Sequence, residues 1–178
     1  MTTSEPARKS KRASRARRMA TIESLDVLVG AHPVALRDLY AEGNPVDATS
    51  LGGERAARLL AFEPLEAAFF LTRRLVRVAS GIVPWQGKHF ESGGTAGRDL
   101  VLGKRAFRFR CEVGPSSLDG RPTLRLAYDG LKNPWPISTR IDEMRRIGET
   151  IAIGVTSLAP AGSSKVTYWW GMDVPAAD

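Results

Sequence analysis

A short cluster of acidic and basic residues is the part of the sequence that most directly suggests chemistry. Asp142 and Glu143 are adjacent, and Arg145 and Arg146 follow closely. Such a cluster is ordinarily a set of surface ion pairs in a hairpin loop. If a carboxylate instead lies at the mouth of an apolar cavity, desolvation raises its pKa toward the range of a general base. Tyr128, Asp142 and Glu143 would then be the catalytic residues of an isomerase or cyclase.

Aromatic and aliphatic side chains form a second candidate site. In the simplest interpretation they only fill a core. In the functional interpretation several line a cavity, in which tyrosine hydroxyl and tryptophan N–H groups are the polar handles. Two of the tryptophans stand beside prolines at strand ends, where they would form a rim. The candidate ligand-binding residues are Trp85, Phe107, Phe109, Leu126, Tyr128, Trp135, Ile141, Ile153, Tyr168 and Trp170.

The residue types predict no metal ion and no cofactor. One cysteine and two histidines are too few for a zinc cluster, and no phosphate-binding glycine motif occurs. His89 lies in an extended stretch in which Lys88 and Phe90 face the other way. Cys111 lies on an apolar strand face, so we expect a small buried hydrophobic residue and not a nucleophile.

Short segments with an apolar period of two must position these residues. They are separated by turn signals such as Gly93-Gly94 and Asp119-Gly120, a pattern typical of a β-sandwich or barrel. About eight antiparallel strands close into a barrel whose interior is filled or holds one small ligand. The predicted strands cover residues 59–62, 82–90, 98–102, 104–113, 123–129, 137–142, 150–156 and 165–172.

Alternation within these strands predicts which side chains face inward. Over 137–142 it places Ile141 inward, and Arg140 and Asp142 outward. Over 150–156 it places Ile153 on an apolar face that we expect to line the interior. A shift of one residue would reverse every such assignment.

Helical periodicity precedes the strands. A short helix is predicted over 21–29, and a second helix begins at Pro33, with Leu36 and Tyr40 on its apolar face. The segment Pro64–Ala79 reads as an amphipathic helix that covers one mouth of the barrel. We therefore expect a mainly β chain: a disordered basic tail over 1–20 and a single barrel domain over 21–178, with N-terminal helices and a lid helix.

The net charge is concentrated in the tail. Residues 1–20 carry seven basic residues and one acidic residue, which accounts for +6 of the formal net charge of +7. The remainder is nearly neutral and predicts no specific nucleic-acid recognition, although residues 8–18 can contact a polyanion or an anionic membrane weakly. The sequence contains no apolar run long enough for a transmembrane helix and no export signal, so we expect a cytoplasmic protein.

Several motifs in order resemble those of a bacterial family of lipocalin-like, calycin-type barrels. The resemblance covers residues 39–170 and implies an eight- to ten-stranded barrel with an apolar interior, without an established reaction. The motifs are WQGKHF at 85–90, FRF at 107–109, VGPS at 113–116, DG at 119–120, YD at 128–129, NP at 133–134, DE at 142–143 and IG at 147–148 and 153–154.

Three functions are compatible with these features. The first is binding of a small hydrophobic molecule, lipid-like or polyketide-like, within the barrel. The second is an isomerase or cyclase that acts on such a molecule. The third is a polyanion-binding adaptor that acts through the basic tail. The apolar inward faces favour the first.

Overall fold

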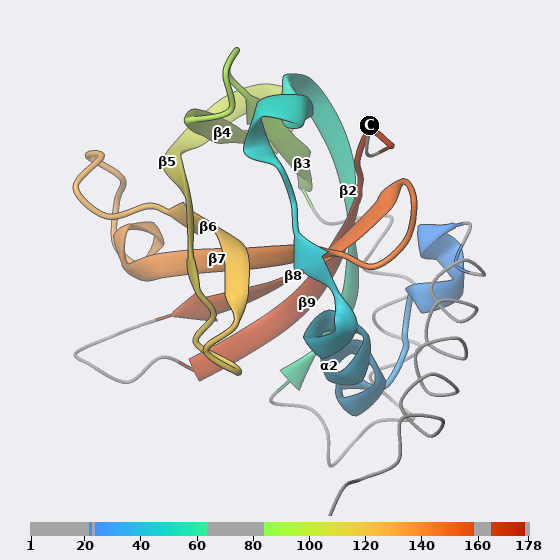
Figure 1. Cartoon of the computed structure of the whole chain (residues 1–178). Helices are drawn as coiled ribbons and strands as arrows, with labels where there is room; N and C mark the ends of the chain where they lie inside the picture. The colour runs from blue at the N-terminus through green and yellow to red at the C-terminus, as the bar shows by residue number, and fades with distance from the viewer. Residues whose placement is uncertain (1–21, 23, 64–83, 159–164, 177–178) are drawn as a thin grey trace, which may run out of the picture.

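The computed structural model shows a mainly β protein and describes residues 22, 24–63, 84–158 and 165–176 (Figure 1). The α-helix of these residues is α2 (Pro33–Glu42), and 3-10 turns occur at η1 (Leu25–Leu28), η2 (Ala48–Leu51) and η4 (Ile137–Thr139). The strands are β1 (Asn44–Pro45), β2 (Gly53–Phe62), β3 (Trp85–Phe90), β4 (Ala96–Val101), β5 (Lys104–Pro115), β6 (Pro122–Ala127), β7 (Arg140–Arg146), β8 (Ile151–Leu158) and β9 (Lys165–Asp173).

The strands from β2 to β9 form a closed antiparallel barrel. Each pairs with the next along the chain, and β9 pairs with β2 to complete the ring. The two-residue strand β1 pairs with the last two residues of β7, beyond the stretch that pairs with β6. The predicted antiparallel barrel of about eight strands is therefore confirmed. None of the helices in the described residues has the length and hydropathy of a membrane span.

The barrel interior is a packed cluster of large side chains. Phe109, Leu126, Tyr128 and Trp170 are all buried in it, as the alternation in the sequence predicts. Glycines make room for the largest rings: a Cβ on Gly154 would lie 2.3 Å from the Trp170 ring. At one end of the barrel η2 contributes Leu51 to this cluster, so that end is filled by side chains.

A second apolar cluster covers the outside of the barrel beneath α2 and η1. It joins Leu36 and Tyr40 of α2 to Ile153 of β8 and Trp169 of β9. The expectation that Ile153 faces the interior is therefore wrong. Strand β8 is buried on both faces, with its bulky side chains outward against the helix and Ala152 inward, so apolar character alone does not distinguish its two sides.

Strand β7 begins later than predicted, and its inward and outward positions are the reverse of those predicted. The sequence predicts a strand over 137–142, but η4 occupies Ile137–Thr139 and β7 starts at Arg140. Asp142 pairs with Leu126 and faces the interior, so alternation turns Ile141 outward. The inward assignment of Ile141 is wrong because the inward positions of β7 hold charged residues that find partners inside the barrel.

The helical predictions have different outcomes. The helix that begins at Pro33 is confirmed, with Leu36 and Tyr40 buried on its inner face. The helix predicted over 21–29 is limited to the 3-10 turn η1. The predicted lid helix Pro64–Ala79 and the basic tail over 1–20 lie outside the described residues.

Candidate functional site

A pocket of about 290 Å³ lies at one end of the barrel. It is formed where β2 and β4 end and where β3, β5, β7 and β9 begin. This end is opposite the one that η2 fills, because the pocket is lined by the last residues of β2 whereas η2 precedes its first. The lining residues are Leu59, Phe62, Pro84, Trp85, Asp99, Val101, Phe107, Arg140 and Tyr168.

Beneath the pocket lies a buried cluster of four charged side chains, Lys88, Asp99, Arg140 and Asp142. Lys88 Nζ lies 2.8 Å from Asp99 Oδ1 and 2.6 Å from Asp142 Oδ2. Arg140 Nη1 lies 3.0 Å from Asp99 Oδ2, and its Nη2 lies 2.6 Å from Asp142 Oδ2. The side chains of Lys88 and both aspartates are fully buried, and that of Arg140 is 7% exposed. The charge of each ion is therefore compensated within the barrel, which a buried ion requires.

Neutral groups complete this cluster. The Tyr128 hydroxyl accepts a hydrogen bond from Lys88 and lies 3.0 Å from a carboxylate oxygen of each aspartate. Thr156 Oγ1 donates to Asp142, and Trp85 Nε1 donates to Asp99. Because Trp85 also lines the pocket, the cluster and the pocket share a wall.

Aromatic rings surround the two cations. Lys88 Nζ lies 5.0 Å from the ring centre of Trp170 and 5.1 Å from that of Phe109. The Arg140 guanidinium lies 4.6 Å from the ring centre of Tyr128. Ring faces attract cations within about 6 Å, so these contacts help to stabilise charges that are buried in the barrel.

Asp142 and the two buried tyrosines of this region have pKa values that are shifted in opposite directions. Burial alone would raise the pKa of Asp142, but Arg140 and Lys88 outweigh burial and hold it well below its usual range. Burial raises the pKa of Tyr128 well above its usual range and that of Tyr168 to about 12. The hypothesis of a general base with a raised pKa at Asp142 is therefore wrong, because two cations contact that carboxylate.

The lowered pKa of Asp142 predicts acid sensitivity. A carboxyl whose pKa is lower when folded contributes stability above its unfolded pKa, about 3.9, and loses it as the pH falls. We expect the free energy of unfolding to fall from about pH 5 downward. We expect Asp142→Asn to be less stable than wild type at neutral pH, and its free energy of unfolding to depend less steeply on pH. Asp119, whose pKa Arg145 also lowers, supplies part of the remaining slope.

Urea denaturation at a series of pH values measures this dependence. Asp129→Asn is the control, because Asp129 lies on the surface and pairs with the exposed Arg110; it should keep the wild-type slope. An Asp142→Asn profile parallel to wild type down to pH 3 would contradict the assignment.

The predicted ligand-binding residues separate into three groups. Trp85, Phe107 and Tyr168 line the pocket. Trp135 is 78% exposed in the loop before β7, and Ile141 and Ile153 face outward from the barrel. The others lie in the interior cluster but not among the pocket-lining residues; these are Phe109, Leu126, Tyr128 and Trp170.

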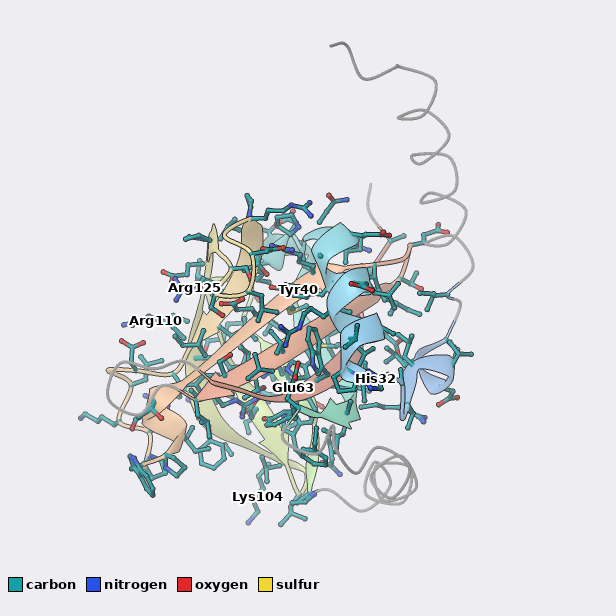
Figure 2. All side chains as sticks on the ribbon, turned by 90° about the horizontal axis from the view of Figure 1, so that it is seen from below. His32, Tyr40, Glu63, Lys104, Arg110 and Arg125 are labelled. Carbon is teal, nitrogen blue, oxygen red and sulfur yellow. The ribbon has the colours of Figure 1, made fainter. Side chains whose placement is uncertain are left out.

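Glu143 belongs to a separate buried cluster on the outer face of β7. Its Oε2 accepts hydrogen bonds from Ser116 Oγ at 2.6 Å and from Tyr40 Oη at 3.3 Å, and its Oε1 accepts one from the Ser117 N–H. Arg145 forms a two-point ion pair with Asp119 beside it. Figure 2 shows Tyr40 on α2, so this cluster fastens the helix to the barrel. The side chain of Glu143 thus lies on the opposite face of β7 from that of Asp142 and does not join Tyr128 and Asp142 in one site.

Lys88, Asp99 and Arg140 are site residues that the sequence pattern did not identify. A signal existed for Lys88: it alternates with His89 and shares a face with Phe90, which is fully buried. The residues around Asp99 and Arg140 give no such signal. Their inward position depends on how their strands pair with other strands, which the local sequence does not show. Cys111, as expected, packs against the interior cluster, and burial raises its pKa to about 12.

Comparison with known proteins supports the fold. No protein-family model and no curated protein matches the chain. The chain is similar to the crystal structure of a protein from Thermomonospora curvata, with a TM-score of 0.55, 14% sequence identity, and coverage of 90% of this chain and 97% of that one. At this identity the likeness concerns the fold alone.

Proposed function

We propose that this chain binds one small, largely apolar molecule in the pocket at the end of the barrel. The observation that carries the proposal is the composition of the pocket wall. Leu59, Phe62, Val101 and Phe107 provide apolar surface, and polar atoms converge at one side, around Asp99 and Arg140. Apolar walls with a few placed polar groups are characteristic of small-molecule sites.

The size of the pocket limits its occupant. A cavity of about 150 Å³ holds benzene, and this pocket has about 290 Å³. The ligand therefore has roughly the size of a short acyl chain or a small bicyclic ring, at the lower end of the lipid-like or polyketide-like class. Carriage of one such ligand is what an eight-stranded barrel of lipocalin-like form allows, and the motif resemblance supports that form.

The pKa of Asp142 favours binding over catalysis. An isomerase or cyclase needs an acid or base whose pKa lies near the working pH. The cations beside Asp142 hold its pKa well below that range, and burial places that of Tyr128 far above it.

Filling the pocket should abolish binding. Val101 lines the pocket at the end of β4, and Val101→Trp places a ring into its space. We expect saturable heat of binding in wild type with short esters, fatty acids or small aromatic compounds, and a loss of affinity of at least about tenfold in the variant. Isothermal titration calorimetry measures both.

Val113→Trp is the matched control for this substitution. Val113 is 63% exposed on β5 and does not line the pocket, so this variant should bind as wild type does. If no compound binds wild type, or if Val101→Trp binds unchanged, the proposed site is wrong.

A further inference from the structure

We infer that the ligand of this pocket is uncharged and presents a hydrogen-bond acceptor, such as an ester or ketone carbonyl, to Arg140. The inference rests on the proposed function and specifies its ligand class. Two features of the buried cluster carry it: the balance of its charges and the hydrogen-bonding groups that remain without a partner.

The first feature is that the cluster is electrically complete. Its two cations, Lys88 and Arg140, are matched by its two anions, Asp99 and Asp142. Arg55 on the inward face of β2 does not belong to this cluster. It is half-buried and donates to the carbonyls of Leu51 and Gly52 at the opposite end of the barrel. A charged ligand would therefore add one uncompensated charge beside this buried cluster, which is strongly unfavourable.

The second feature is that the acceptors of the cluster are mostly occupied. Trp85, Lys88 and Tyr128 contact Asp99 Oδ1, and Arg140 donates to Asp99 Oδ2. A carboxylate has about four lone-pair sites, so Asp99 Oδ1 has no site left for a donor on the ligand and Oδ2 has one.

Both oxygens of Asp142 are filled. Lys88, Thr156 and two nitrogens of Arg140 contact its oxygens, and Tyr128 lies within hydrogen-bond distance. Asp142 therefore has no site for an amine or an ammonium group, and most of the acceptor capacity of Asp99 is used within the cluster.

Among the described residues, in contrast, Arg140 has donors left over. The three N–H groups of Lys88 are used on Asp99, Tyr128 and Asp142. Arg140 has five N–H groups, of which three are used within the cluster, and it lines the pocket. A ligand that accepts a hydrogen bond would satisfy one of the remaining N–H groups of Arg140. A buried N–H group that lacks an acceptor is costly.

A matched set of probes tests the inference in wild type at neutral pH. Methyl octanoate is a neutral acceptor, octanoate an anion and octylamine a cation, all with the same alkyl chain. We expect methyl octanoate to bind at least about tenfold more tightly than either charged probe. Octanoate should gain affinity as the pH falls toward its own pKa, because its neutral form becomes populated.

Asp99→Asn tests the charge balance directly. The variant leaves two cations and one anion in the cluster, so the affinity ratio should shift toward octanoate by about tenfold. Circular dichroism checks that the variant folds. If it does not fold, the affinities of the three probes for wild type decide the test alone. Octanoate or octylamine binding wild type as well as the ester, or an unchanged ratio in folded Asp99→Asn, would overturn the inference and leave the proposed function in place. If neither these three probes nor the short esters, fatty acids and small aromatic compounds named above bind wild type, the proposed function itself fails.

Discussion

Lys88→Met is expected to lower the free energy of unfolding by about 3–5 kcal/mol. Lys88 is fully buried and contacts both Asp99 and Asp142. Removal of its charge leaves two carboxylates with only Arg140 to compensate them, and a buried charge that loses its partner is much more costly than the pair is stabilising. Urea denaturation, monitored by tryptophan fluorescence, measures the change.

Two further variants make this result specific. Lys104→Met replaces a lysine at the start of β5 that is exposed to solvent (Figure 2), so it should stay within about 0.5 kcal/mol of wild type. Lys88→Met combined with Asp99→Asn restores the charge balance, and it should be destabilised by less than the sum of the single changes. If Lys88→Met melts like wild type, the cluster does not contribute to stability as its geometry indicates.

Phe109→Arg is expected to prevent folding. Phe109 is 1% exposed, packs against Phe90 and Tyr128 and lies 5.1 Å from Lys88 Nζ. An arginine there adds a third cation to the cluster of Lys88 and Arg140, without an anion to pair with it. The cost, at least about 4 kcal/mol, is a large part of the 5–15 kcal/mol that stabilises a typical domain.

Arg110→Phe is the matched change one position along the strand. Arg110 faces solvent and forms an exposed ion pair with Asp129, which is worth at most about 1 kcal/mol. This variant should fold, and circular dichroism together with soluble yield distinguishes the two. A soluble, folded Phe109→Arg protein would mean that the register of β5 differs by one residue from the one described.

The architecture could be predicted because several strands alternate cleanly. In β5 and β6 the inward positions hold Phe109, Leu124 and Leu126, while outward positions hold arginines such as Arg110. The period of two is visible in such strands because one face is apolar and the other is polar. Those strands and their turns were sufficient to predict the barrel.

The site could not be predicted because its strands break that rule. In β7 the inward residues Arg140 and Asp142 are charged, so an interpretation by polarity turns them toward water and shifts the register by one residue. In β8 both faces are buried, and the larger Ile153 faces the helix. The correct register is set by partners such as Lys88, which lies on a strand more than fifty residues away along the chain. Sequence patterns contain no direct signal for such partners.

The pairing of β2 with β9 has a consequence for when the barrel can close during synthesis. Leu59 of β2 lies opposite Trp170 of β9, and the pocket needs both Leu59 and Tyr168 in its wall. A ribosome adds about 5–20 residues per second, so β2 exists for several seconds with an open edge before β9 leaves the exit tunnel. During translation the nascent chain therefore has neither a closed ring nor a pocket, and any ligand can be acquired only after residue 173 has emerged.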